Sequence, residues 1–134
     1  MATRLRELEW CRFHYDDELW RVLLTTPRLA PSFLTGLRDG TLVAVCHYEI
    51  RTIYVDAGFP PAELAETLHH EFHHVGRDKR GQGEDDHRFF AESSPIVVGI
   101  YAAIGIDLCP PLPDGWERLH KSSKRWHAAR EWSA

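Results

Sequence analysis

The stretch from Pro60 to Gly76 reads PPAELAETLHHEFHHVG and decides the fold expected for this chain. Proline is tolerated in the first turn of a helix, and Glu63 and Glu66 would lie near its positive end. Apolar residues then recur at spacings of three and four, which predicts an amphipathic helix with one buried stripe. Gly76 follows the stripe and is expected to end the helix. The stripe consists of Leu64, Leu68, Phe72 and Val75.

Residues 70–74 of this helix read HEFHH, which is the pattern H-E-x-x-H. Two imidazoles four residues apart project from one helical face, about one turn apart, and suit two ligands of a tetrahedral zinc ion. A glutamate between them can take a proton from a metal-bound water, as zinc hydrolases require. On the helical wheel Glu71 lies between the apolar stripe and the pair. The pattern predicts zinc on His70 and His74, with Glu71 as the catalytic base.

A second pair, His69 and His73, has the same spacing but is not expected to form the catalytic metal site. On the helical wheel this pair lies on the opposite flank, about 160° from Glu71. A metal ion bound there would have no glutamate base. We therefore expect His69 and His73 to be exposed bystanders, and a solvated histidine face without metal is the remaining alternative.

A catalytic zinc ion normally has three protein ligands and one position for water. After the helix, residues 77–83 are polar and rich in turn formers, which predicts a loop, and residues 84–92 follow as a second helix. His87 lies in the first turn of that helix and is the predicted third ligand, because imidazole suits zinc well. The competing donors are the carboxylates Asp86 and Glu92 and, on an upstream strand, Cys46 and His47.

The order of these segments resembles that of the zincin metallopeptidases, in particular the small SprT-like and minigluzincin types. The resemblance covers roughly residues 51–92: a strand at 51–55, the helix with LHHEFHH, and a helix with DHRFF at 86–90. It implies an α+β fold, in which a small antiparallel or mixed sheet packs on the active-site helix with further helices. It also implies a zinc-dependent peptidase acting on a peptide or protein substrate.

The two zincin types differ in the third ligand. Similarity to the SprT-like group implies a histidine after a variable loop, which is His87, whereas similarity to the gluzincins implies Glu92 or Asp86. No C-x-x-C pair is present, so the zinc ribbon of some SprT-like proteins is absent and a role on DNA is not implied. In zincins a strand beside the cleft pairs with extended substrate, and the resemblance assigns that role to part of 41–56. A plain structural hairpin is the alternative.

Composition and charge narrow the class of protein. The 134 residues are most simply one zincin-like domain, 1–134, with ordinary hydrophobic (43%) and charged (27%) fractions. Three separated cysteines argue against a disulfide scaffold and for a reducing compartment. There is no signal-peptide core at the start and no membrane-spanning run, so a cytoplasmic protein is expected. The net charge of −4 gives no general attraction to nucleic acid.

The remaining segments supply the other elements. Residues 4–25 mix apolar and charged residues in a way that suggests one or two amphipathic helices. Asp39-Gly40 is a hairpin-type turn, followed by β-prone segments at 41–46 and 51–55. After the site, a cap at 93–95 precedes an apolar helix at 96–104, and a proline-rich connector follows Cys109. Residues 116–132 are expected to form a terminal helix that packs on the domain.

The chemistry expected is peptide-bond hydrolysis by a metal-activated water, with Glu71 taking the proton and returning it to the leaving amine. Two alternatives stay open: a zinc hydrolase of another amide bond with Cys46 as a ligand, and an inactive regulatory or interaction protein with structural zinc. A further donor would stabilise the oxyanion of the tetrahedral intermediate. The residues that can supply it are Tyr48, Tyr54, Tyr101 and His120.

Overall fold

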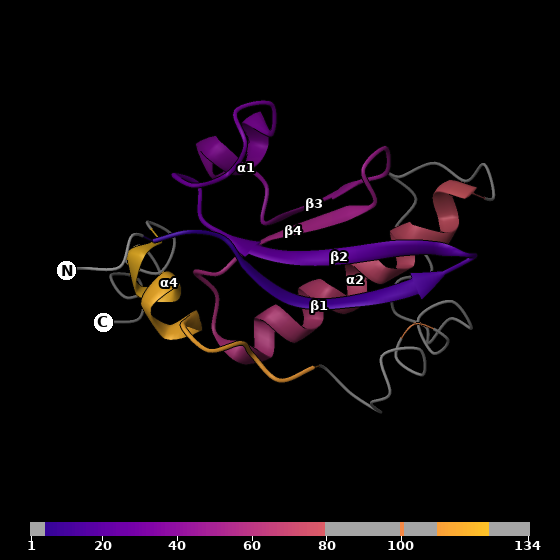
Figure 1. Ribbon diagram of the computed structural model, residues 1–134. Helices are drawn as coiled ribbons and strands as arrows, with labels where there is room; N and C mark the ends of the chain where they lie inside the picture. The colour runs from indigo at the N-terminus through magenta and orange to yellow at the C-terminus, as the bar shows by residue number, and fades with distance from the viewer. Residues whose placement is uncertain (1–4, 80–99, 101–109, 124–134) are drawn as a thin grey trace.

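The computed structural model describes residues 5–79, Ile100 and residues 110–123. Four strands and three helices lie in this part of the chain, so the fold is α+β with a mixed sheet, as the sequence predicts. Figure 1 shows the sheet in front, with α2 crossing behind it. The elements are β1 (Leu8–Tyr15), β2 (Glu18–Thr25), α1 (Thr35–Asp39), β3 (Ala44–His47), β4 (Thr52–Asp56), α2 (Pro61–Lys79) and α4 (Trp116–Ser122).

The chain begins with a β-hairpin, so the helices predicted for residues 4–25 are wrong. Strands β1 and β2 pair in an antiparallel manner along their whole length. Asp16 and Asp17 form the two-residue turn between them, with φ angles of 52° and 62°. Two consecutive left-handed residues give the backbone twist that a tight hairpin requires. In β2 the buried residues Trp20, Val22 and Leu24 alternate with more exposed ones, as expected for a strand with one face in the core.

The four strands are arranged in the order β1-β2-β4-β3. Strand β2 runs parallel to β4, whereas β3 is antiparallel to β4, which makes the sheet mixed. The predicted strands at 41–46 and 51–55 are therefore confirmed, although the first begins only at Ala44. Every residue of β4 is buried, because β4 lies inside the sheet and both of its faces are covered. Among the described strands, β3 and β1 form the two edges.

The predicted hairpin turn at Asp39-Gly40 is instead the end of helix α1. Gly40 has a φ of 82°, and its N–H donates to the carbonyl of Leu37. A glycine in this left-handed conformation is a common helix terminator, because it has no Cβ to clash. The helix packs over the sheet face opposite α2, where a small second cluster is buried. This cluster consists of Ala30, Leu34, Leu37 and Tyr54.

Helix α2 forms where the sequence predicts it and packs on the other face of the sheet. All four residues of the predicted stripe are fully buried in the main core. Phe72 meets Phe13 of β1 edge to face, with ring centroids 5.1 Å apart. Full burial of such a side chain contributes roughly 1.5–3 kcal/mol, so the stripe fixes which face of α2 meets the sheet. Gly76 does not end the helix, which continues to Lys79.

Helix α4 and the segment that precedes it lie beside the sheet, near the beginning of β1. The indole N–H of Trp10 in β1 donates to the carbonyl of Pro110 at 3.1 Å. Leu119 of α4 is buried in the main core. Ser123 then adopts an extended conformation and ends α4, so the helix is shorter than the one predicted for 116–132. Figure 1 shows α4 beside the end of the sheet at which β1 begins.

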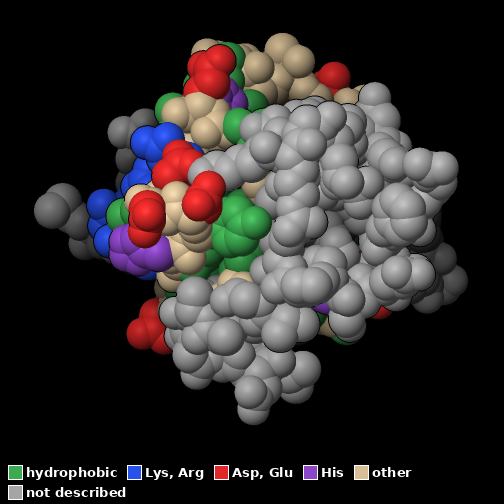
Figure 2. All heavy atoms as spheres, turned by 90° about the vertical axis from the view of Figure 1, so that its right-hand side faces the viewer, with side chains coloured by type: hydrophobic (Ala, Val, Ile, Leu, Met, Phe, Trp, Pro, Cys, Tyr) green, Lys and Arg blue, Asp and Glu red, His purple; other side chains and the backbone are tan. Residues whose placement is uncertain are grey.

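Several predicted segments lie outside the described residues. These are the helix at 84–92, the cap at 93–95, Cys109 and the helix at 96–104 except Ile100, which is helical and buried. None of the helices described is long and apolar enough to cross a lipid bilayer. On the face seen in Figure 2, acidic, basic and histidine side chains stand next to one another, so the described surface there carries charges of both signs.

Candidate metal centre

Helix α2 brings the two histidines of the H-E-x-x-H pattern together. Nε2 of His70 lies 3.2 Å from Nε2 of His74. Two nitrogens that both bind a tetrahedral zinc ion at roughly 2.0–2.1 Å are about 3.3–3.4 Å apart. The separation of the pair is therefore close to that of two ligands of one zinc ion.

Glu71 lies with this pair on the inner side of α2. Its side chain is 6% exposed, and one carboxylate oxygen lies with the two imidazole nitrogens in a cluster whose donor atoms are within 4.8 Å of one another. Its neighbour Phe72 is buried in the main core, so the glutamate is at the boundary between core and cavity, as the helical wheel predicts. A carboxylate held there would serve as a base for water on a metal ion that the two histidines would hold.

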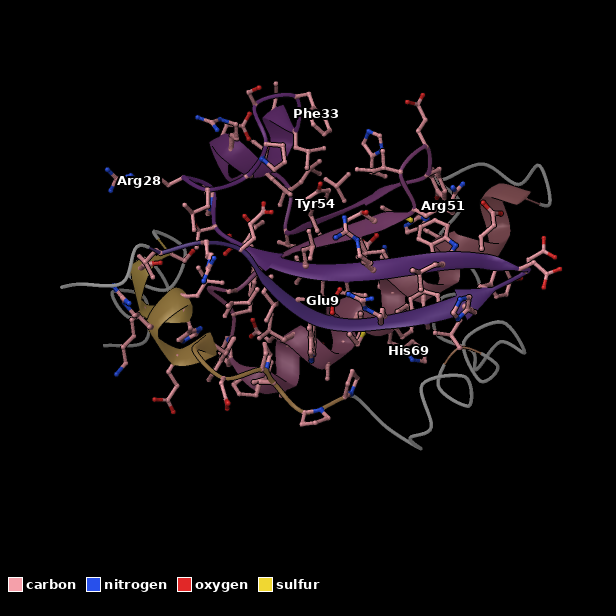
Figure 3. The ribbon with its side chains drawn as sticks, in the orientation of Figure 1. Glu9, Arg28, Phe33, Arg51, Tyr54 and His69 are labelled. Atoms are coloured by element: carbon pink, nitrogen blue, oxygen red, sulfur yellow. The ribbon has the colours of Figure 1, made fainter. Side chains whose placement is uncertain are left out.

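His69, from the second histidine pair, does not belong to this cluster. His69 is half-buried and does not line the cavity that His70 and His74 share. Figure 3 shows His69 toward the β1 edge of the sheet, whereas the cavity lies beside β3 at the opposite edge. The side chain of His73 is outside the described part. His69 thus provides a control residue on the same helix, next to the site but not in it.

The histidine pair opens into a cavity of about 420 Å³ between α2 and the β3 edge of the sheet. One wall comes from helix α2 and the other from the segment that leads into β3 and from β3 itself. Cavities of this size accommodate small ligands or a few side chains. The lining residues are Thr41, Leu42, Val43, Ala44, Val45, Cys46, Tyr48, Thr67, His70, Glu71 and His74.

The direction of the peptide groups along β3 follows from its pairing with β4. The N–H of Asp56 donates to the carbonyl of Val43 at 3.0 Å. Residues along an antiparallel pair alternate between hydrogen-bonded and non-hydrogen-bonded positions. Val45 therefore also bonds to β4, whereas the peptide groups of Ala44 and Cys46 point away from β4. Those groups face the outer edge of the sheet, where the cavity lies.

Tyr48 links the turn after β3 to α2, the helix that carries the histidine pair. Its hydroxyl donates to the backbone carbonyl of His74 at 3.3 Å, and its ring meets Trp20 edge to face. Of the four candidates for stabilising the oxyanion, Tyr48 is the one described residue that lines the cavity. Tyr54 is buried in the second cluster, where desolvation raises the pKa of its phenol. His120 is buried in α4, with Nδ1 2.7 Å from the carbonyl of Ala57, and Tyr101 is outside the described residues.

The predicted third ligands are only partly placed. His87, Asp86 and Glu92 all lie outside the described residues. Cys46 lines the cavity, but its sulfur does not belong to the cluster of donor atoms within 4.8 Å. His47 is on the other face of β3, where its ring packs against Phe33 at 5.2 Å (Figure 3 labels Phe33).

Sequence reasoning missed Thr67, which lines the cavity one turn before the histidine pair. Its spacing of three from His70 and four from Glu71 places it on the same helical face and is the signal that identifies it. Comparison of the chain with protein-family models, with curated proteins and with solved structures finds no match in any of the three. The function is therefore inferred from the site alone.

Proposed function

We propose that this protein is a zinc-dependent peptidase. The observation that carries the proposal is the 3.2 Å separation of the two Nε2 atoms, with a carboxylate oxygen of Glu71 in the same cluster. Two imidazoles can supply two of the three protein ligands of a catalytic zinc site, and a carboxylate beside them can serve as the base for water in the remaining position. We propose His87 as that third ligand, with Asp86 and Glu92 as the competing residues.

Glu71 is the acid–base group of this proposal. Zinc, when bound, supplies a Lewis acid that lowers the pKa of water and polarises the scissile carbonyl. Glu71 removes the proton from the attacking water and delivers it to the amine that leaves. Its burial supports this role, because a buried carboxylate at the cavity wall is held in one position beside the histidine pair.

The β3 edge supports an extended peptide as the substrate. The N–H and carbonyl of Ala44 point toward the cavity side of the sheet, where a strand added to the edge can pair with them. A peptide bound in this way would run along the wall that faces His70 and Glu71. We infer that the backbone pairing orients the substrate, while the residues of α2 carry out the hydrolysis.

The proposal is tested by comparing wild-type protein with Glu71→Gln and with His69→Ala. Each protein is loaded with zinc, and cleavage of a mixture of proteome-derived peptides is followed by mass spectrometry. We expect Glu71→Gln to keep zinc but lose hydrolysis by about 100-fold or more, because general acid–base catalysis contributes on the order of 10²–10⁴. His69→Ala should cleave as wild type does. Full turnover by Glu71→Gln would contradict the assigned base.

Cys46 favours a second candidate, a zinc-dependent hydrolase of another amide bond. This thiol lines the same cavity as the histidine pair and can ligate zinc as a thiolate. The test is the zinc content of Cys46→Ser, since loss of zinc would favour this candidate and unchanged zinc would exclude it. For either hydrolase we infer the cytoplasm, because three cysteines that are far apart in the sequence argue against a disulfide scaffold.

A further inference from the structure

We propose that the outer face of the sheet, which is the face turned away from α2, docks an acidic segment of a protein partner. This face lies on the side of the sheet opposite the candidate metal centre, so docking there does not depend on the proposed function. Three features support it: a row of side chains that crosses the sheet, the exposed apolar residues around that row, and the charges at the end of the sheet.

One row of side chains crosses all four strands on the outer face. The register of the sheet places Arg12 of β1 opposite Arg21 of β2, and Arg21 beside Thr52 of β4. Thr52 in turn lies opposite His47 of β3. A residue adjacent in sequence to each of these four packs in the main core, so the alternation of a strand turns the row toward the outer face. These core residues are Phe13, Trp20, Ile53 and Cys46.

Two arginines stand directly opposite each other in this row. Like charges in such a cross-strand pair repel, which costs stability. Arg12 has an ion pair with Glu9 at 2.7 Å. Arg21 is exposed and makes no hydrogen bond or ion pair within the described part of the chain, although the charge of the half-buried Glu7 acts on it. An anionic group bound across the two guanidinium groups would offset the repulsion and give Arg21 a hydrogen-bonded partner.

Exposed apolar side chains surround the row. Phe33 is 58% exposed and meets the ring of His47 edge to face at 5.2 Å. Leu19 is 41% exposed and lies two residues before Arg21 on the same face of β2, and Val43 is 37% exposed on the outer side of the sheet. Figure 3 looks onto this face, with α2 behind the sheet, and labels Phe33. Apolar residues exposed near one another mark surfaces that bind other proteins, and aromatic and arginine side chains are enriched at the centres of such surfaces.

Helix α1 covers only the neighbouring part of the outer face. The adjacent row consists of Leu23, Tyr54 and Val45, and these side chains pack in or against the second cluster beneath α1. Arg12 and Arg21 are exposed, so the row that contains them is open to a partner.

The charges favour an acidic protein segment over other occupants of this face. A second copy docked through the same face would bring its own arginines toward those of the first. The phosphates of a nucleic acid would be repelled at the end of the sheet where both turns carry acidic residues. These residues are Asp16, Asp17 and Glu49. An acidic segment with aliphatic side chains complements both the arginines and the apolar residues around them.

The probe is a fluorescein-labelled peptide of about twelve residues that contains only glutamate, leucine and serine. Two matched peptides replace glutamate by lysine or leucine by serine, and a thymidine oligonucleotide of similar length represents nucleic acid. Binding is measured by fluorescence anisotropy in the Glu71→Gln background, so that the proposed hydrolysis cannot consume a peptide. We expect the acidic peptide to bind at least about tenfold more tightly than each other probe, and its binding to weaken as the salt concentration is raised.

Arg21→Gln tests the row, and Arg28→Gln is its control with the same change in charge. Arg28 is also exposed, but Figure 3 shows it at the left of the molecule, whereas Arg51, next to the row, is at the right. Arg21→Gln should weaken binding of the acidic peptide by about tenfold, because it removes a charged donor. Phe33→Ala should weaken it by about fivefold or more. Equal losses in the two arginine variants would overturn the assignment of the row.

Amide chemical shifts of isotope-labelled protein locate the bound peptide. We expect them to change at Arg21, Thr52 and His47. Changes confined to the cavity between α2 and β3 would place the peptide in the proposed substrate cleft and overturn docking on the outer face. Failure of the acidic peptide to bind, or tighter binding of the oligonucleotide, would also overturn it. A lack of peptidase activity would leave these binding results unchanged, so the failure of one proposal can be told from the failure of the other.

Discussion

The hydroxyl of Ser123 donates a 2.9 Å hydrogen bond to Oδ1 of Asp56, joining residues 67 positions apart in the sequence. Both side chains are buried, and the same Oδ1 accepts the N–H of Gly58 at 2.8 Å. Residues 56–58 lead from β4 into the helix that carries the histidine pair. The end of α4 therefore holds the loop from which α2, the helix with the H-E-x-x-H pattern, begins.

Ser123→Ala should lower the free energy of unfolding by about 1–3 kcal/mol, because it leaves a buried carboxylate oxygen with one donor fewer. Denaturant unfolding measures this loss. Ser122→Ala is the matched control, because Ser122 is exposed and its hydroxyl donates to the carbonyl of Leu119 within the same helix. Its effect should stay within about 0.5 kcal/mol. Equal losses in the two variants would contradict the role of Ser123.

Gly58→Ala tests the same junction by crowding it. A Cβ at Gly58 would clash with Oγ of Ser123 and lie 2.8 Å from its Cβ. Crowding in a packed region costs about 1–3 kcal/mol, so the variant should unfold at lower denaturant concentration. Adding Ser123→Gly removes both atoms that clash. The double variant should lose less than the sum of the two single variants, and a simple sum would show that the two residues do not interact.

Tyr48→Phe should affect stability more than metal binding. The substitution removes the hydrogen bond to the carbonyl of His74 but leaves the ring that packs on Trp20. We expect a loss of about 0.5–1.5 kcal/mol in unfolding free energy and no change in zinc content. Thermal unfolding and metal analysis of the same sample check both parts. Loss of zinc from a stable variant would show that the tyrosine positions His74 for the metal.

Glu7, which lies outside the candidate metal centre, makes the stability of the folded protein depend on pH. Burial raises the pKa of this carboxyl above 4.5 in the folded state, against smaller opposing effects of the hydrogen bond from Thr25 and the charge of Arg21. Because the folded protein holds this proton more tightly than the unfolded chain, the associated stability is present below about pH 4.5 and is lost as pH rises through the folded-state value.

Glu7→Gln removes this titration while keeping the shape of the side chain. Relative to the wild type, the variant should therefore become more stable as the pH is raised from about 4 to about 7. Melting temperatures of both proteins across that range measure the difference. A difference that stays constant, or that moves in favour of the wild type, would contradict the raised pKa.

The helix with the H-E-x-x-H pattern could be predicted from sequence because its apolar residues follow one helical period without interruption. Its C-terminal end could not, since one glycine in a helix costs only about 1 kcal/mol and contacts elsewhere can offset that cost. Gly76 therefore lies inside α2. Gly40, by contrast, does end a helix, because its φ of 82° suits a residue without Cβ.

The first strand was wrongly predicted as helix for a specific reason. Its pairing with β2 shifts between Glu9 and Cys11, which is the irregularity of a β-bulge. The bulge places Trp10 and Phe13, three residues apart, in the same core, and that spacing imitates a helix. The alternation of Trp20, Val22 and Leu24 in the next strand, after a two-residue Asp16-Asp17 turn, was the signal for a hairpin.

Part of the candidate site follows from local spacing, and part depends on tertiary structure. His70, Glu71 and His74 share a helical face because of their spacing, and the structure brings them together. The position of Cys46 and Ala44 along the same cavity depends on the sheet order, which places β3 at an edge beside α2. No local pattern encodes that order, because it results from the pairing of segments far apart in the sequence.

The most direct test of the metal centre is zinc binding measured by competition with a chromophoric chelator. Wild-type protein and His69→Ala should each bind one zinc ion per chain with the same affinity. His70→Ala and His74→Ala should each weaken binding by more than about tenfold, because each removes a direct ligand. Folding of the variants is checked by circular dichroism. Unchanged zinc affinity in a folded His70→Ala/His74→Ala double variant would contradict the metal centre and the peptidase built on it.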